Sequence, residues 1–165
     1  ERAPDGGGGG GAAVARVSSP GGAAAAEPLV AARMGRPDLD GRVLRTGRVP
    51  SMQLESLFCA ATAVAVPSCY EGFGLPVLEA MVRGVPVVAA DAGSLPEVAR
   101  SDDLVAPDDV TAWAAALEAV VAADPAARAA RIEAGRRQAG RFTPDRTAAA
   151  LIGSYRRAAD DRRTK

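Results

Sequence analysis

The stretch that decides the fold is Pro67-Ser-Cys-Tyr-Glu-Gly-Phe-Gly-Leu-Pro-Val-Leu-Glu-Ala-Met81. It follows the short apolar run Ala63–Pro67, which is typical of a buried parallel strand. A helix is predicted to begin near Leu75 or Pro76, because proline is favoured at the first helical position. A strand, a glycine-containing loop and a helix in this order indicate one unit of an open parallel sheet. In such sheets, ligands bind beyond the carboxyl ends of the strands.

The loop within this stretch suits a ligand that carries phosphate. Gly72 and Gly74 let the backbone approach a ligand and leave N–H groups free. The loop leads into a helix N-terminus, where unpaired N–H groups and the helix dipole favour phosphate. Glu71 precedes the loop and Glu79 is predicted on the first helical turn; each carboxylate can accept hydrogen bonds from a vicinal diol. The arrangement predicts a diphosphate seat between two diol-binding carboxylates, which fits a nucleotide-sugar.

Each of these residues also has a purely structural interpretation. Glu79 could complement the helix dipole, Glu71 could be a solvated loop charge, and the two glycines could be ordinary turn residues. Their occurrence together, in this order, favours the binding interpretation.

The rest of the chain alternates short apolar runs with helical patterns. Further strands are predicted at Ala12–Val17, Arg42–Thr46, Val85–Ala90 and Asp103–Ala106. Helices are predicted at Ala23–Met34, after an N-cap at Ser51, and at Leu95–Ala99, Val110–Ala123, Pro125 to about Arg141 and Pro144 to about Asp160. The arginines between Arg128 and Arg141 are predicted to lie on a solvated helix face. This alternation predicts an α/β fold with a Rossmann-like, doubly wound parallel sheet and a helical C-terminus.

Composition narrows the classes of function. The 165 residues are enough for one domain with a hydrophobic core, and their formal net charge of zero argues against a nucleic-acid partner. The sequence has no histidine, which excludes a histidine-based triad or metal site within this chain. No apolar run approaches the about 20 residues of a transmembrane helix. Cys59 and Cys69 are predicted to be buried, reduced thiols, so a cytoplasmic location is expected.

Several motifs resemble those of one enzyme family. Glu71–Glu79 resembles the E-x7-E motif of GT4-type retaining glycosyltransferases, which have the two-domain GT-B fold. The other matching segments are Thr46–Pro50, similar to that family's Gly-x-Val loop, Gly84–Asp91 and Gly93–Val98, similar to its next strand and turn, and Arg141–Pro144, similar to the element before its final helix. The resemblance extends from about Asp40 to Arg157. It implies that the chain is the C-terminal, donor-binding half of a GT-B enzyme.

The resemblance also implies roles for individual residues. Glu79 would hold the ribose hydroxyls of the donor, and Glu71 would act as the catalytic residue by contacting the donor sugar near its anomeric carbon. The backbone of residues 73–75 would contact the sugar and the diphosphate, and Gly47 and Arg48 would lie by the nucleobase. The predicted donor-binding residues are therefore Gly47, Arg48, Glu71, Gly72, Phe73, Gly74, Leu75 and Glu79.

The family's reaction transfers a hexosyl group from a nucleoside-diphosphate sugar with retention, usually without a bound metal or other cofactor. The acceptor is a glycan, a lipid or a small molecule. Helix N–H groups and basic side chains would stabilise the diphosphate leaving group. The resemblance implies that a separate N-terminal domain, outside these 165 residues, binds the acceptor and provides any association with a membrane.

The chain departs from the family in its basic residues. The family places an arginine and a lysine on the pyrophosphate, whereas the only lysine here is Lys165. Either Arg16 corresponds to that arginine, or the strand at Ala12–Val17 is the second strand of the domain and both basic residues lie upstream. The chain is accordingly the donor-binding part of an active enzyme or a catalytically inactive, nucleotide-sugar-binding remnant or fragment.

Three segments are predicted along the chain. Residues 1–11 contain six consecutive glycines and are expected to be a linker or a disordered segment. Residues 12–160 form the nucleotide-sugar-binding Rossmann-like domain, which is expected to be incomplete at its N-terminus. Residues 161–165 are expected to be a charged tail.

Overall fold

The fold is built on a parallel sheet. The computed structural model describes residues 14–16, 32, 36–39, 42–44 and 46–163. Its strands are β1 (Val14–Arg16), β2 (Ala63–Val66), β3 (Val87–Ala90) and β4 (Leu104–Val105). They lie side by side in the order of the chain, and every neighbouring pair is parallel. This arrangement confirms the predicted Rossmann-like sheet.

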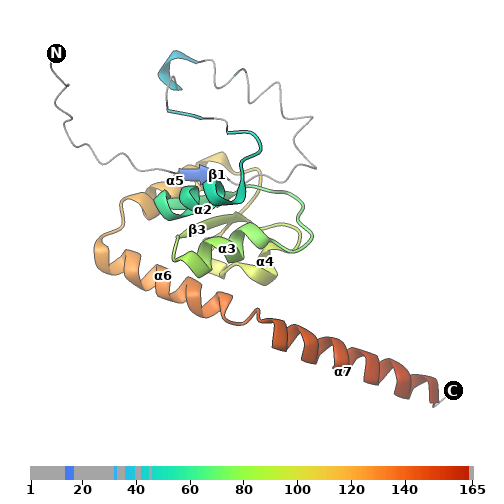
Figure 1. Ribbon diagram of the computed structural model, residues 1–165. Coiled ribbons are helices and arrows are strands. Elements are labelled where there is room, and N and C mark those ends of the chain that lie inside the picture. Colours follow the sequence, from blue (N-terminus) through green and yellow to red (C-terminus); the bar gives the residue numbers. More distant parts are fainter. Residues whose placement is uncertain (1–13, 17–31, 33–35, 40–41, 45, 164–165) are drawn as a thin grey trace.

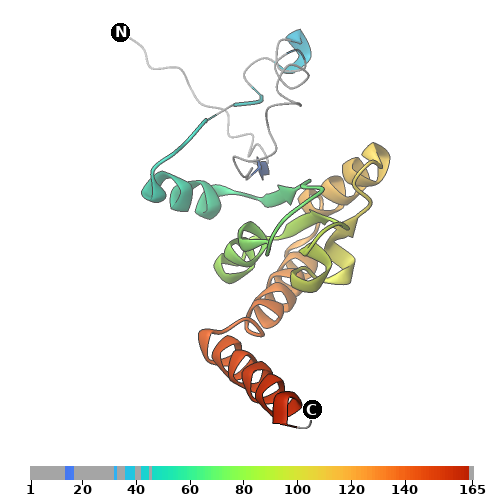
Figure 2. The ribbon, with the colours of Figure 1, turned by 90° about the vertical axis from the view of Figure 1, so that its right-hand side faces the viewer.

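Helices cover both faces of the sheet (Figures 1 and 2). The helical elements are η1 (Pro37–Leu39), α2 (Ser51–Ala60), α3 (Leu75–Arg83), α4 (Leu95–Val98), η2 (Ser101–Asp103), α5 (Val110–Val121), α6 (Pro125–Ala139) and α7 (Pro144–Arg163). Helices α3 and α4 pack on one face, where α6 lies against α3, and α5 packs on the other. Helix α7 extends away from the body of the domain (Figure 1).

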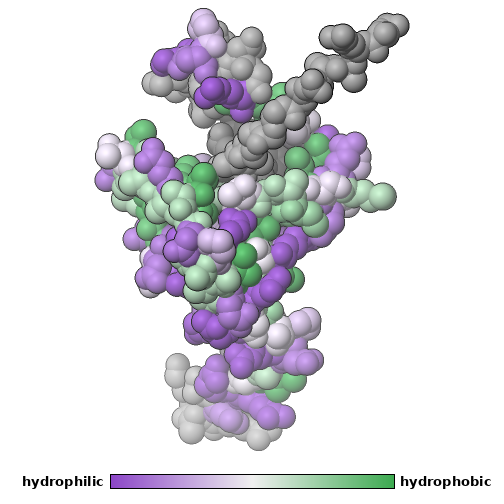
Figure 3. Space-filling view, turned by 90° about the vertical axis from the view of Figure 1, so that its left-hand side faces the viewer, coloured by the Kyte–Doolittle hydropathy of each residue, from purple (hydrophilic) through white to green (hydrophobic). Residues whose placement is uncertain are grey.

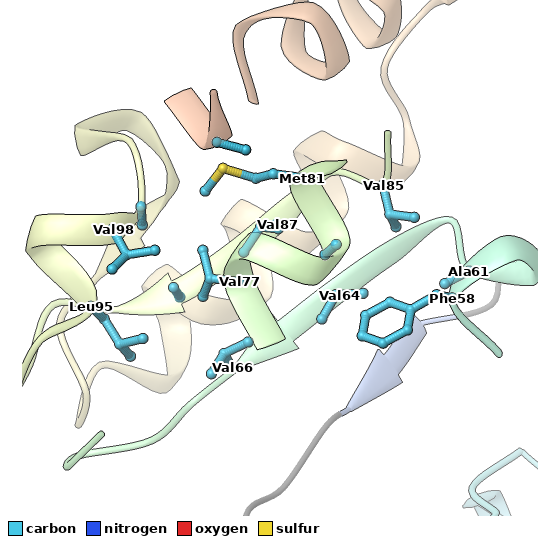
Figure 4. Packing of buried hydrophobic residues seen from close by; sticks show 14 of the residues in the cluster. Phe58, Ala61, Val64, Val66, Val77, Met81, Val85, Val87, Leu95 and Val98 are labelled. Atoms are coloured by element: carbon cyan, nitrogen blue, oxygen red, sulfur yellow. The ribbon is translucent and has the colours of Figure 1, made fainter. Parts of the chain in front are cut away.

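The central strands are apolar throughout because both of their faces are covered. All eight residues of β2 and β3 are buried. Val64, Val66 and Val87 pack against Val77 of α3 (Figure 4). On the opposite face, Ala63 and Val88 join a second cluster with Val105 and Val120. Full burial of one such valine stabilises the fold by about 1.5–3 kcal/mol. Because side chains of β2 and β3 enter both clusters, every position in the two strands is apolar, which explains the continuous apolar runs in the sequence.

The sequence signals at several helix ends are confirmed. Helix α3 begins at Leu75 with Pro76 in its first turn, and it ends at Gly84, which has φ 74°. Only glycine adopts this left-handed conformation without steric cost, so it is well suited to end the helix. At the start of α7, the hydroxyl of Thr143 accepts a hydrogen bond of 3.3 Å from the Arg146 N–H.

Other predicted elements differ from the structure. The described residues of the predicted strand Arg42–Thr46 form no strand, because no other described strand lies beside them. Ser51 is the first residue of α2 rather than its N-cap; Pro50 holds that position and has no side chain that could cap. The predicted linker over residues 1–11 and almost all of the predicted helix Ala23–Met34 lie outside the described residues.

Both cysteines are free and exposed, so the prediction that they are buried is wrong. Cys59 follows the buried Phe58 on α2 and therefore faces away from the core. Cys69 lies in the loop that follows β2, outside the apolar run that suggested its burial.

Helix α6 is fastened to the sheet by arginines that were expected to be solvated. Arg128 donates a hydrogen bond of 2.9 Å to the carbonyl of Thr62, and Arg131 donates one of 3.1 Å to the carbonyl of Val87. Arg131 also lies 2.7 Å from the carboxylate of Asp103, which is buried. Burial raises the pKa of Asp103, while the arginine charges oppose this increase. The prediction of a solvated face is therefore wrong for these two arginines, whose long side chains reach carbonyls at the amino edge of the sheet.

The distribution of hydrophobic surface differs along the molecule. Hydrophobic and hydrophilic residues are mixed over the body of the domain, and hydrophilic residues prevail towards the end that carries α7 (Figure 3). Among the described helices, none alone has the length and hydropathy needed to cross a membrane. Only the bent pair 110–121 and 125–160, with 110° between its parts, meets such a criterion, by length and composition alone.

Candidate functional site

The candidate site lies at the carboxyl edge of the sheet. The loop over residues 67–74 leaves β2 and leads into α3, and the loop over residues 91–94 leaves β3 and leads into α4. Since β2 and β3 are adjacent and parallel, their following loops are brought together at one edge. This is the edge at which open parallel sheets bind ligands.

Gly74 shapes the entry into α3. It is the N-cap residue of the helix and has φ 94° and ψ 37°, a conformation that residues with a side chain rarely adopt. A Cβ atom added there would lie 3.0 Å from Cδ2 of Leu95 in α4. Among the described residues, none accepts a hydrogen bond from the N–H groups of Gly72, Phe73 or Gly74. The loop therefore offers free donors at the positive end of the α3 dipole.

The two carboxylates bracket this loop, as the sequence predicts. Glu71 and Glu79 are both half-buried, and neither carboxylate forms a hydrogen bond or ion pair with another described residue. Glu79 is the fifth residue of α3, so the prediction that it lies on the first helical turn is wrong. The dipole effect falls off within the first turn. A role for Glu79 in complementing the dipole is correspondingly weaker, and its charge interacts with that of Arg83, one turn further along α3.

Exposed apolar side chains surround the loop. Phe73 is 47% exposed and Leu75 is 59% exposed, although both are large and hydrophobic. The ring of Phe73 meets that of Phe142 edge to face, with 6.0 Å between centroids and 84° between ring planes. Phe142 lies between α6 and α7, so this contact joins the loop to the C-terminal helices. The site thus combines free N–H donors, two carboxylates and an apolar surface on which a sugar ring could rest.

Gly47 and Arg48 lie in the segment that precedes α2. Both are exposed, and Gly47 has φ 61° with no atom within 4 Å of the position that a Cβ atom would take. No hydrogen bond, ion pair or ring contact links either residue to Glu71–Glu79 within the part of the chain that the structure describes. One loop and the helix that follows it therefore hold six of the eight predicted donor-binding residues, those from Glu71 to Leu75 and Glu79.

Sequence reasoning missed three residues that support the loop: Gly93, Ser94 and Phe142. Ser94 donates a hydrogen bond of 2.8 Å from Oγ to the carbonyl of Glu71, and Gly93 lies directly against the backbone of Tyr70 and Glu71. The available signal was the position of Gly93 and Ser94 immediately after a buried strand next to β2. Loops that follow adjacent parallel strands share one edge of the sheet.

A separate cavity of about 320 Å³ lies between α5 and α6. It is lined by four alanines and Val120 together with Arg100, Asp102 and Arg131. Arg131 binds the carbonyl of Val87, the first residue of β3, so this cavity is at the amino edge of the sheet. Arg100 pairs with Asp102, and Arg131 pairs with Asp103, which lies outside the lining. None of the predicted site residues lines this cavity.

Comparisons with known proteins give a consistent assignment. The family described as "Glycosyl transferases group 1" matches residues 16–123. The D-inositol 3-phosphate glycosyltransferase of Mycobacterium avium (strain 104) is 47% identical over 108 residues, which cover 64% of this chain and 26% of that protein. The O-antigen chain mannosyltransferase B of Escherichia coli is 51% identical over 77 residues, which cover 46% of this chain and 20% of that protein. The chain thus spans about a quarter or less of these relatives.

Solved structures show the same relationship in three dimensions. Sucrose-phosphate synthase from Thermosynechococcus elongatus superimposes with a TM-score of 0.67 at 29% identity, covering 83% of this chain and 35% of that one. The C-terminal domain of a glycosyl transferase group 1 family protein from Francisella tularensis gives a TM-score of 0.61 at 28% identity, covering 70% of this chain and 61% of that one. The chain belongs to the group 1 glycosyltransferases, and its sheet and helices are those of the C-terminal half of their GT-B fold.

Proposed function

We propose that this chain is the part of a retaining glycosyltransferase that binds the nucleoside-diphosphate sugar. The observation that carries the proposal is the loop between β2 and α3. Its N–H groups have no acceptor among the described residues. The half-buried carboxylates of Glu71 and Glu79, which form no hydrogen bond or ion pair there, stand on either side of residues 72–74. A diphosphate flanked by two diol-bearing rings has the complementary pattern of charge and hydroxyl groups.

The proposal assigns a role to each part of the loop. Glu79 accepts hydrogen bonds from the ribose hydroxyls, and Glu71 contacts the donor sugar near its anomeric carbon, where it takes part in transfer with retention. The N–H of Gly72 donates to the sugar, and the backbone of residues 73–75 contacts the sugar and the diphosphate. As the bond from the anomeric carbon to the diphosphate breaks, negative charge grows on the leaving oxygen, and the N–H groups at the start of α3 stabilise it. No metal ion or other cofactor is part of this proposal.

The rest of the reaction is assigned to other parts of the protein. Because the chain spans 26% or less of the relatives described above, we propose that a preceding N-terminal domain binds the acceptor. The transferred group is a hexosyl group, and the acceptor is a glycan, a lipid or a small molecule. Gly47 and Arg48 lie by the nucleobase in this proposal. The free state of Cys59 and Cys69 supports the cytoplasm as the compartment, since exposed thiols persist in reducing surroundings.

Binding of nucleotides by calorimetry tests the proposal. UDP, GDP and ADP and their glucose or mannose forms are titrated into the chain, into Glu79→Ala and into the control Glu118→Ala. Glu118 is exposed on α5, so its removal changes the charge without touching the site. We expect one base to bind and Glu79→Ala to weaken that binding by about tenfold or more, because a hydrogen bond to a charged group contributes about 1.5–3 kcal/mol.

Each other result has a definite meaning. Equal affinities for the parent chain and Glu79→Ala would show that the ribose site is wrongly assigned. If none of these nucleotides or nucleotide-sugars binds, the proposal is overturned for this chain. Binding followed by no transfer, once the chain is joined to its N-terminal half and given acceptor, would identify an inactive nucleotide-sugar-binding protein.

A further inference from the structure

The loop after β3 is fastened to the candidate donor loop at a single peptide group. Ser94 donates a hydrogen bond of 2.8 Å from its Oγ to the carbonyl oxygen of Glu71, 23 residues away along the chain, in a half-buried position. The carboxylate of Glu71 itself has no partner among the described residues. The placement of Glu71 therefore depends on how its backbone is held.

The hydroxyl of Ser94 is used in an unusual way for its position. Ser94 is the N-cap residue of α4, where a serine side chain normally accepts a hydrogen bond from an N–H group of the first turn. Its hydroxyl forms no such bond. By contrast, Asp109 and Asp124 cap α5 and α6, where each carboxylate accepts a hydrogen bond of 2.8 Å from a backbone N–H group. The Ser94 hydroxyl thus donates to the neighbouring loop and does not cap its own helix.

Gly93 allows the two loops to come close enough for this bond. It has φ 58°, and a Cβ atom added to it would lie 3.1 Å from the Glu71 nitrogen and 3.4 Å from the Glu71 carbonyl oxygen. A side chain at position 93 would therefore be strained and would press against the backbone of Glu71.

We propose that Ser94 is a positioning residue that orients the peptide between Glu71 and Gly72 towards the donor sugar; this inference rests on the function proposed above. In a trans peptide, the C=O and the following N–H point in opposite directions, and no described peptide is cis. With the Glu71 C=O held by Ser94 on the inner side, the Gly72 N–H points to the opposite side, where Gly72 is exposed. The same bond fixes the Cα atom from which the Glu71 carboxylate extends.

The test compares two ligands that share a nucleotide but differ in the sugar. The nucleoside diphosphate that the parent chain binds and its glucose or mannose form are titrated by calorimetry into Ser94→Ala, Ser94→Thr and Ser56→Ala. Ser56 also donates its hydroxyl to a backbone carbonyl, that of Met52 at 3.0 Å, but it is exposed on α2. Thermal unfolding of each variant checks that it is folded, and Ser94→Gly is the second hydroxyl-free variant if Ser94→Ala does not fold.

We expect Ser94→Ala to weaken binding of the nucleotide-sugar by about fivefold to tenfold, as the loss of one hydrogen bond implies. Binding of the nucleoside diphosphate alone should change less than about twofold, because Glu79 and the start of α3 remain in place. Ser94→Thr should restore the parent affinity, and Ser56→Ala should match the parent for both ligands.

Two results would overturn the inference while leaving the proposed function intact. One is an unchanged nucleotide-sugar affinity in Ser94→Ala; the other is an equal loss for both ligands, which would indicate a general effect on the fold. If the parent chain binds no nucleotide at all, the proposed function fails, and this inference fails with it. The parent titration therefore separates the two failures.

Discussion

Single backbone positions decide whether the candidate site can form. Gly74 and Gly72 lie two residues apart in the same loop, yet their surroundings differ. Gly74 has φ 94° and would place a Cβ atom 3.0 Å from Leu95, whereas Gly72 has no positive φ and no atom within 4 Å of a Cβ position. The two glycines form a matched pair in which only one is required by the backbone.

We expect Gly74→Ala to lower the free energy of unfolding by about 1–2 kcal/mol, because alanine is strained in the left-handed region and its methyl group displaces Leu95. Gly72→Ala should change it by less than about 0.5 kcal/mol. Urea unfolding followed by the fluorescence of Trp113, the only tryptophan, measures both. Equal effects of the two substitutions would show that the conformation of Gly74 is not what fixes the loop.

At this scale the sequence predicts a residue well when its role depends on its near neighbours. Glu71, Gly74 and Glu79 stand out because a strand, a loop and a helix follow one another within a few residues. Ser94 was missed because its partner is 23 residues away. Its role follows only from the pairing of β2 with β3, which places the two loops together.

Among the elements, α6 shows most clearly how tertiary contacts override a local pattern. Its arginine-rich sequence suggests a solvated helix, but Arg128 and Arg131 bind carbonyls at the sheet and Gln138 binds the carbonyl of Val98 at 3.0 Å. The helix also lies close to α3, and Gly135 is buried opposite Met81. The sequence predicted the limits of this helix, while the face that it buries depended on contacts with distant segments.

Gly135 gives a test of this packing. A Cβ atom there would lie 3.4 Å from Cγ of Met81, an ordinary contact distance. We expect Gly135→Ala to raise the free energy of unfolding by about 0.5–1 kcal/mol, because alanine favours the helix. Gly135→Leu should lower it by about 1–3 kcal/mol through overpacking against α3. If urea unfolding shows that leucine is tolerated as well as alanine, α6 does not pack against Met81 in solution.

Most of the predicted strands form in the structure, whereas the described part of one does not, and tertiary contacts again make the difference. Ala63–Pro67 and Val85–Ala90 contain the buried β2 and β3, because a short apolar run with covered faces has few alternatives. Arg42–Thr46 has only two apolar residues, Val43 and Leu44, between its arginines, and no other described strand lies beside it. Val43 and Leu44 are 42% and 84% exposed there. A strand is stable only when its backbone groups find partners, and the sequence alone does not show whether they do.

For the whole molecule, the main contrast is between the packed domain and α7. From Pro144 to Asp160, every residue of α7 except Gly153 is exposed, including Leu151, Ile152 and Tyr155. Trp113, in contrast, contacts both hydrophobic clusters and donates a hydrogen bond of 3.1 Å to the carbonyl of Ala106. The helix and the core should therefore respond separately to substitution.

A proline placed in each of two helices tests this independence. Ala149→Pro interrupts α7 and should reduce the helical circular dichroism signal, while the unfolding midpoint reported by Trp113 stays unchanged. Ala134→Pro interrupts α6 and should lower the stability of the core by about 3 kcal/mol or more. A shift of the Trp113 midpoint in Ala149→Pro would mean that α7 packs against the domain in solution.

The order of the strands has a consequence for synthesis on the ribosome. Because β1 to β4 lie side by side in chain order, each strand after β1 meets a partner that has already been made. Both loops of the candidate site are complete once residue 94 has been translated. Their support arrives later, when α6 brings Gln138 to the end of α4 and Phe142 meets Phe73. We therefore expect the nascent chain to acquire its donor loop early but to fix it fully only after Phe142, which follows α6, has left the exit tunnel.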